Sequence, residues 1–131
     1  HAFPTPAALA AADDAELAAC GLGYRVKYVK QTAGMVAEGT IDLDEIGGLD
    51  DEELKARLLR FPGVGVKVAA CVMLFAYARM DAFPVDVWIE KVFREQFPQG
   101  FPYEHYRGAA GILQQYLFCY IRHEAGRAQG R

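Results

Sequence analysis

Residues 54–88 read LKARLLRFPGVGVKVAACVMLFAYARMDAFPVDVW, and the rest of the chain is organised around this stretch. A helical pattern runs into Phe-Pro-Gly-Val-Gly at residues 61–65, and a second, very apolar helix begins at once. That second helix carries one amine, Lys67, in its first turn, and a carboxylate, Asp86, follows in the loop beyond it. The stretch predicts two helices joined by a glycine hairpin, with a lysine and an aspartate beside it.

The hairpin glycines, Gly63 and Gly65, are typical of a turn that binds phosphate. Glycine adopts backbone angles that other residues avoid and lets another backbone approach closely. The first N–H groups of the helix that opens at Val66 have no partner inside that helix, so an anion such as a DNA phosphate binds well there. A plain tight turn is the alternative interpretation of a bare Gly-x-Gly. The longer string around it, followed by Pro-Val-Asp, is more specific.

Lys67 is unusual because it is the only charged residue between Arg60 and Arg79. A cation at a helix N-terminus meets the unfavourable end of the helix dipole, and apolar surroundings disfavour the ammonium form. Both effects favour a fraction of free amine, which is a nucleophile. The alternatives are a lysine that extends from the rim of a buried helix to solvent, or a lysine that contacts phosphate.

Asp86 precedes a helical pattern, so it is expected to cap that helix. A carboxylate held in this position can also face a sugar carbon that becomes positively charged as its base leaves. Capping and chemistry are compatible at this residue.

The composition is that of a globular chain, with 131 residues of which 53% are hydrophobic and 24% charged. The net charge of −3 argues against a general nucleic-acid coat protein, yet permits an enzyme whose basic residues gather on one face. The longest uncharged apolar run, residues 68–78, is shorter than the roughly 20 residues that a bilayer requires. Three dispersed cysteines, Cys20, Cys71 and Cys119, favour reduced thiols in a cytoplasmic protein over a disulfide framework.

These signals predict one all-helical domain over residues 1–131, an orthogonal bundle that contains a helix-hairpin-helix motif. The helix over residues 66–80 is apolar nearly all round and is expected at the buried centre. The last helix, over residues 106–122, is expected to bury the stripe Ile112, Leu113, Tyr116, Leu117 and Tyr120. The other expected helices span residues 6–20, 24–38, 42–46, 51–60 and 86–97.

Residues 59–69, Leu-Arg-Phe-Pro-Gly-Val-Gly-Val-Lys-Val-Ala, together with Pro-Val-Asp at 84–86, resemble the helix-hairpin-helix superfamily of DNA base-excision glycosylases. Within it the chain is most similar to the 8-oxoguanine DNA glycosylases. The resemblance implies that Lys67 attacks the sugar C1′ of a flipped-out nucleotide, expels the base and forms a Schiff base, with assistance from Asp86. Strand cleavage by β-elimination can follow. The implied partner is double-stranded DNA containing oxidised guanine, bound by a monomer.

Two further stretches carry the resemblance. Gly-Leu-Gly-Tyr-Arg at residues 21–25 matches a family segment in which the tyrosine, here Tyr24, wedges into the base stack and the arginine, here Arg25, reads the cytosine left behind. An ordinary helix start with an exposed aromatic residue is the alternative.

Gln-Gln-Tyr-Leu-Phe at residues 114–118 matches a family segment that binds the base. Gln114 would hydrogen-bond the base edge, Phe118 would stack on it, and Cys71 would pack on its other side. Each pair, Gln114 with Phe118 and Lys67 with Cys71, is four residues apart on one helical face. Simple core packing is the alternative for Phe118 and Cys71.

The family's hairpin also tends to hold Na⁺ or K⁺ through backbone carbonyls, and the matching positions are Leu59, Phe61 and Val64. No cofactor is otherwise implied.

The chain departs from the family at Trp88, where a histidine is common, and at Ala70, where some relatives have an acid. The family's preceding helices, its asparagine-bearing wedge and its small β-domain have no counterpart. We therefore expect a fragment that is weakly active or inactive alone.

Two other functions remain open from the sequence. One is an endonuclease III-type pyrimidine-lesion glycosylase, which shares the hairpin but usually has four clustered cysteines for an iron–sulfur cluster, whereas Cys119 stands alone near the C-terminus here. The other is a helix-hairpin-helix DNA-binding module without chemistry, in which Lys67 contacts phosphate.

Overall fold

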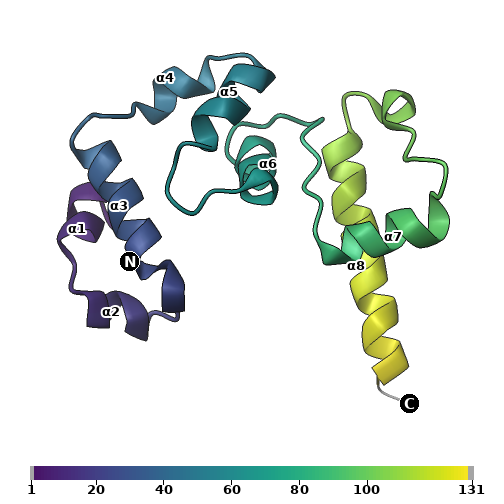
Figure 1. The fold of residues 1–131 in the computed structure, drawn as a ribbon, viewed down its shortest axis with the longest axis horizontal. Helices are drawn as coiled ribbons and strands as arrows, with labels where there is room; N and C mark the ends of the chain where they lie inside the picture. Colours follow the sequence, from purple (N-terminus) through teal and green to yellow (C-terminus); the bar gives the residue numbers. More distant parts are fainter. Residues whose placement is uncertain (1, 130–131) are drawn as a thin grey trace. The chain divides into compact units, whose positions relative to one another are not determined.

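A computed structural model describes the backbone of residues 2–129 and the side chains of residues 2–126. Every regular element within those residues is a helix, which confirms the all-helical class. The chain divides into two compact units, residues 1–64 (unit 1) and residues 65–131 (unit 2), so the boundary falls inside the glycine hairpin (Figure 1). The prediction of a single domain stays a prediction.

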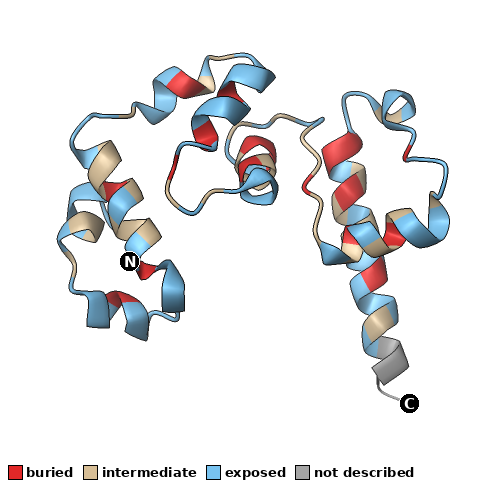
Figure 2. Cartoon of the chain, viewed as in Figure 1, coloured by how far each residue is buried: buried red, intermediate tan, exposed pale blue. Residues whose placement is uncertain are grey.

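Unit 1 contains five α-helices and one 3₁₀ turn among the described residues. Helix α3 packs against α1 and α2, and α4 packs against α5. The buried apolar residues of this unit lie on α2, α3, α4 and α5 and in the turn that follows α5 (Figure 2). The elements are α1 (Pro6–Ala11), α2 (Asp14–Ala19), η1 (Gly23–Arg25), α3 (Val26–Ala37), α4 (Leu43–Gly47) and α5 (Asp51–Leu58).

The helix expected over residues 6–20 is in fact two helices. Thr5 caps α1 as expected, with its hydroxyl oxygen accepting the Ala8 N–H at 3.2 Å. The helix then ends, and Asp13 caps the next one. Its carboxylate accepts the Ala15 N–H at 2.7 Å, and the Glu16 carboxylate accepts the Asp13 N–H. This reciprocal capping box starts α2 because it satisfies donors that a continuous helix would have used internally.

Unit 2 contains α6 (Val66–Phe75), α7 (Val87–Gln96), η2 (Tyr103–Tyr106) and α8 (Ala110–Gln129). Helices α7 and α8 pack against each other, and α8 also contacts η2. Aromatic rings from the α7 side of this unit cluster around Phe101, with ring centroids 4.9–5.7 Å from its own. Burial raises the pKa of the Tyr103 phenol in this cluster.

Helix α6 is shorter and less buried than expected. It ends at Phe75, because Ala78 adopts a left-handed conformation (φ 53°) and the Arg79 N–H turns back to the Met73 carbonyl at 2.9 Å. Val66 and Phe75 are 63% and 64% exposed, and the buried side chains are those of Ala69, Met73 and Leu74. Helix α6 is apolar on nearly all of its faces, but only the face that carries Ala69, Met73 and Leu74 is buried.

Helix α8 is rotated relative to the predicted core stripe. Ile112, Tyr116 and Tyr120 are exposed, at 42%, 71% and 57%, so the prediction was wrong at these three positions. The buried positions of this helix are instead Ala110, Gly111, Gln114 and Ile121.

Gly111 explains this rotation. Its N–H donates to the Met80 carbonyl at 2.7 Å, and a Cβ on this residue would lie 2.6 Å from a methyl carbon of Leu74. Only a glycine permits the helix to approach the loop after α6 so closely. The contact fixes which face of α8 is turned inward.

Candidate functional site

The start of α6 is open in a way that the start of α7 is not. Gly65 is the N-cap of α6, and within the described residues no side chain caps this helix. Its backbone is extended (φ −96°, ψ −179°), and a Cβ here would meet no atom within 4 Å. Gly65 therefore does not use the unusual backbone angles that glycine can adopt. What the residue leaves is space beside the first N–H groups of the helix.

Gly63 has a different role in the same hairpin. Its φ is +76°, and a Cβ would lie 2.5 Å from two ring carbons of Tyr28. Both the backbone angle and the close ring require a glycine. Tyr28 on α3 therefore packs directly on the hairpin turn. Sequence reasoning missed this residue.

Tyr28 also joins the turn to the residues expected to wedge into DNA. Its ring meets the Tyr24 ring edge to face, with centroids 6.4 Å apart. Tyr24 is 71% exposed, and the Arg25 guanidinium lies over its ring at 4.6 Å. The available signal was the four-residue spacing of Tyr24 and Tyr28, which lets two aromatic rings meet on adjacent turns. Unit 1 thus holds Tyr24, Arg25 and Gly63 in one connected cluster.

Lys67 is exposed in the first turn of α6, and Cys71 is half-buried one turn further along the same helix. The neighbouring valines, Val66 and Val68, are exposed as well. The apolar enclosure expected for the amine is therefore not present around it. The amine is accessible to a ligand that approaches the open end of the helix.

Asp86 is the N-cap of α7, as predicted. Its Oδ1 atom accepts the N–H groups of Trp88 and Ile89, both at 3.0 Å. Both bonds use Oδ1, so the second oxygen, Oδ2, takes no part in this cap. A half-buried carboxylate fixed through one oxygen can direct the other at a ligand.

The base-binding candidates on α8 lie one turn apart. Gln114 is only 3% exposed, and its side-chain oxygen accepts a hydrogen bond from the Gln115 amide. Phe118 is half-buried. The Arg122 guanidinium lies 5.8 Å from the Phe118 ring centroid and 5.7 Å from that of Trp88. Sequence reasoning did not single out Arg122, although it follows Phe118 by four residues on the same helix.

The candidates divide between the units. Unit 2 contains Lys67, Cys71, Asp86, Gln114 and Phe118, and within it a chain of contacts runs from Asp86 through Trp88 and Arg122 to Phe118. Unit 1 contains Tyr24, Arg25 and Gly63, and Gly65 opens unit 2.

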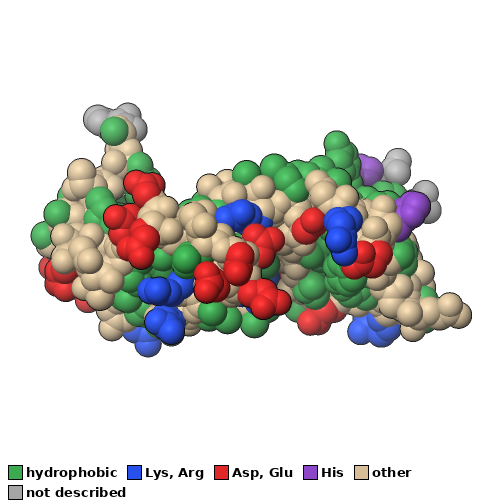
Figure 3. All heavy atoms as spheres, turned by 90° about the horizontal axis from the view of Figure 1, so that it is seen from above, with side chains coloured by type: hydrophobic (Ala, Val, Ile, Leu, Met, Phe, Trp, Pro, Cys, Tyr) green, Lys and Arg blue, Asp and Glu red, His purple; other side chains and the backbone are tan. Residues whose placement is uncertain are grey.

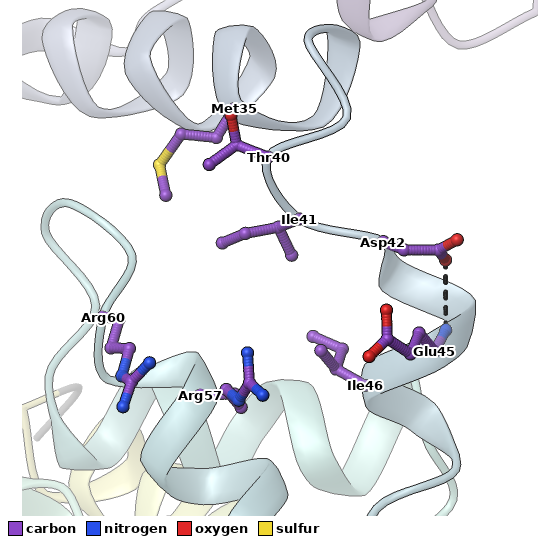
Figure 4. A pocket seen from close by; sticks show the side chains of 8 residues that line it. All are labelled: Met35, Thr40, Ile41, Asp42, Glu45, Ile46, Arg57 and Arg60. Atoms are coloured by element: carbon purple, nitrogen blue, oxygen red, sulfur yellow. Dashed lines mark hydrogen bonds between the residues drawn. The ribbon is translucent and has the colours of Figure 1, made fainter.

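A cavity of about 230 Å³ lies in unit 1, and none of these residues lines it. Figure 4 shows Arg57, Arg60 and Ile46 along the lower side of it and the side chain of Ile41 above them. Asp42 lines it too, but its Oδ1 is engaged in capping α4 through the Glu45 N–H at 3.0 Å. The cavity offers balanced charge and neither lysine nor glutamine, so we do not assign the candidate site to it.

Charge and metal ligands constrain the site further. On the face shown in Figure 3, acidic and basic side chains are mixed, so this face does not form a basic stripe. Across the described residues, no group of three or more histidine, cysteine, aspartate or glutamate side chains is arranged to hold a metal ion. In the same residues, no helix is long and apolar enough to cross a membrane.

Known proteins resemble both the sequence and the fold. The model of the HhH-GPD superfamily of base excision DNA repair proteins matches residues 1–99. A "Probable N-glycosylase/DNA lyase" of Methanothermobacter thermautotrophicus is 35% identical over 116 residues, which are 82% of this chain and 37% of that protein. The "N-glycosylase/DNA lyase" of Saccharomyces cerevisiae is 32% identical over 108 residues, which are 74% of this chain and 29% of that protein.

A solved structure is similar over most of the chain. The 8-oxoguanine glycosylase/lyase of Clostridium acetobutylicum, in complex with double-stranded DNA containing cytosine opposite 8-oxoguanine, gives a TM-score of 0.85 at 34% identity. The match covers 95% of this chain and 46% of that protein, so the chain spans less than half the length of these relatives. The matched model covers most of the chain, which therefore belongs to the HhH-GPD superfamily of base excision DNA repair proteins.

Proposed function

We propose that this chain carries the catalytic and base-binding part of a bifunctional DNA glycosylase and lyase that removes 8-oxoguanine from duplex DNA. The observation that carries the proposal is an exposed lysine at the open, uncapped start of α6, in a unit that also contains a carboxylate fixed through one oxygen. The relatives support the reaction class, since they are named as N-glycosylase/DNA lyases and as an 8-oxoguanine glycosylase/lyase.

Lys67 supplies the nucleophile in this mechanism. Its uncharged amine attacks C1′, and the glycosidic bond breaks with its electron pair leaving on the base, which takes up a proton. Asp86 stabilises the positive charge that develops at the sugar through Oδ2, the carboxylate oxygen that does not cap α7. The amine nitrogen loses a proton and the sugar ring opens to give a Schiff base.

The lyase step follows from the same intermediate. Loss of a proton from C2′ expels the 3′ phosphate, and water then hydrolyses the Schiff base and returns the free Lys67 amine. Because base excision ends at the Schiff base on Lys67 and strand cleavage starts from it, a reductant that traps this adduct reports the intermediate that the two steps share.

Cys71, Gln114 and Phe118 form the base pocket in this proposal, with the base between the thiol and the phenyl ring. Gln114 is already bonded to Gln115 through its oxygen, so recognition of the base uses its N–H₂ group or exchanges that bond. Its burial favours recognition, because a buried amide left unpaired by a wrong base costs free energy.

Tyr24, Arg25, Gly63 and Gly65 contact the DNA in this proposal. The exposed ring of Tyr24 fills the space of the extruded base, Arg25 binds the opposite cytosine, and the space at Gly65 admits a phosphate to the start of α6.

The monovalent cation remains a proposal for the carbonyls of Leu59, Phe61 and Val64. The Phe61 carbonyl accepts the Val64 N–H at 3.1 Å, which leaves it one lone pair for an ion. The cation would fix the turn and strengthen its attraction for phosphate.

The test is borohydride trapping of the full-length gene product on duplex DNA that contains 8-oxoguanine opposite cytosine. We expect a covalent complex that Lys67→Gln abolishes and that Lys55→Gln, a change of an exposed lysine on α5, leaves intact. Trapping that survives Lys67→Gln would exclude the assigned nucleophile.

A module that binds DNA without chemistry is the second candidate, favoured by the exposure of Lys67 at a helix start, where a phosphate contact is also possible. That candidate predicts no trapped complex and a weaker DNA affinity in Lys67→Gln. A duplex with an oxidised pyrimidine, used in parallel, distinguishes the endonuclease III-type alternative.

A further inference from the structure

Arg122 has an unusual pair of contacts. Its guanidinium carbon lies 5.7 Å from the ring centroid of Trp88 on α7 and 5.8 Å from that of Phe118 on α8. Both distances are inside the roughly 6 Å within which a cation is attracted to an aromatic face. In the part of the chain that the structure describes, these two rings are the partners of Arg122. One cation therefore joins two helices through their aromatic side chains.

Trp88 also connects Arg122 to the Asp86 cap of α7. Trp88 donates its backbone N–H to Asp86 Oδ1 at 3.0 Å, and its side chain lies under Arg122. The ring of Phe118, which is on α8 with Arg122, lies near the same guanidinium. A displacement of the Phe118 ring is thus opposed by a group that is itself held against the first turn of α7.

The contact also accounts for Trp88. The 8-oxoguanine DNA glycosylases commonly have a histidine where this chain has Trp88. The indole ring of tryptophan is the aromatic side chain that binds a cation best. Arginine suits the same contact because its flat guanidinium stacks on rings while its edges stay hydrated, which agrees with the exposure of Arg122. Trp88 and Arg122 are therefore understood as a pair.

We infer that Arg122 is a positioning residue, which links the Phe118 ring to Trp88 through its guanidinium, holds that ring in place before a base enters, and so raises the affinity for the damaged base. The inference rests on the proposed function, because it takes Phe118 as the ring that stacks on the base. Arg122 itself touches no reacting atom. Its loss should weaken base binding and leave the chemistry at Lys67 intact, because ordering the ring before binding lowers the cost of binding.

The experiment compares two substrates in the full-length gene product. Excision of 8-oxoguanine needs the base pocket, whereas cleavage at an abasic site needs Lys67 and Asp86 but no base. We expect Arg122→Leu to raise KM for the 8-oxoguanine duplex about two- to fivefold, the range given by loss of an exposed cation–π contact. Cleavage of the abasic duplex should not change, Arg122→Lys should restore most of the loss, and the exposed Arg94→Gln on α7 should have no effect.

A fluorescence measurement tests the contact independently of DNA. Trp88 is the only tryptophan of the 131 residues, so the emission that is lost in Trp88→Phe belongs to it. Removing a cation from above the indole should shift that emission in Arg122→Leu and much less in Arg122→Lys.

Each outcome decides the inference. Equal losses on both substrates, or a loss in kcat alone, would assign Arg122 to general structure and overturn it, as would unchanged KM and unchanged emission. If the wild-type protein excises no 8-oxoguanine, the proposed function fails, and a shifted Trp88 emission still supports the Arg122 contact by itself.

Discussion

The two units each place cations on aromatic rings, but over different distances along the chain. In unit 1 Arg25 lies over Tyr24 at 4.6 Å and Lys27 lies over Tyr28 at 4.9 Å, so each cation is next to its ring in sequence. In unit 2 Arg122 contacts a ring on its own helix and a second ring on α7. The first cluster is built from one short segment, and the second exists only because two helices pack.

The difference separates what each cluster can do. The unit 1 cluster is exposed at Tyr24 and is anchored at Gly63, which suits a surface that meets DNA. The unit 2 cluster is half-buried at Trp88 and Phe118 and is bonded to the Asp86 cap, which suits a pocket with fixed geometry. If this division is correct, changes in the unit 2 cluster alter chemistry and base binding, and changes in the unit 1 cluster alter DNA contact.

The largest effect is expected at Asp86. Asp86→Asn keeps an N-cap of nearly equal quality, so stability should change by only a few tenths of a kcal/mol. The neutral amide cannot stabilise a cationic sugar, and single-turnover excision should fall by about 10²–10³-fold with DNA affinity retained. Excision kinetics and urea unfolding of the same samples check this. Loss of folding in Asp86→Asn would leave only the capping role.

The next effect is expected at Gly63 and separates it from Gly65. Gly63→Ala introduces a side chain at φ +76° and 2.5 Å from the Tyr28 ring, and should cost about 2–4 kcal/mol in unfolding free energy. Gly65→Ala, with extended backbone and open space, should change stability by less than about 1 kcal/mol, because the gain from a stiffer unfolded chain is offset by alanine's poorer N-cap, yet it should weaken DNA binding. Urea unfolding and DNA affinity measure the pair. Equal stability losses in both variants would contradict the roles assigned here.

The smallest effect is expected at Arg25. Arg25→Ala should leave folding unchanged and reduce the preference for cytosine opposite the lesion by about 1–3 kcal/mol. Excision measured opposite each of the four bases checks this. An unchanged preference would show that Arg25 does not recognise the opposite base. An equal loss of excision opposite every base would show that Arg25 is needed for excision itself, which contradicts the separate roles of the two clusters.

Sequence reasoning succeeded where the signal is local. The caps at Thr5 and Asp86 follow from side-chain bonds to backbone groups two or three residues away, and the turn at Gly63 follows from the conformational freedom of glycine. The break between α1 and α2 was also local. The spacing of Asp13 and Glu16 is a capping box that could have been read from the sequence.

The remaining features depend on contacts between distant segments. The rotation of α8 is set by Gly111 against the loop after α6, and this contact outweighs an apolar stripe on the other face. Tyr28 against Gly63 and Arg122 over Trp88 join residues 35 and 34 positions apart, and no periodic pattern predicts such pairs. At Gly65 the backbone is ordinary, and the feature that the sequence could not show is the open space beside this residue.

The most direct measurement is the location of the borohydride-trapped adduct on the protein. Trypsin cuts after Arg60, Lys67 and Arg79, and a modified Lys67 blocks the middle cut. We predict that mass spectrometry finds the DNA-derived mass on an uncut peptide of residues 61–79. The same mass on another lysine or on the N-terminal amine, with the cut after Lys67 intact, would contradict Lys67 as the nucleophile.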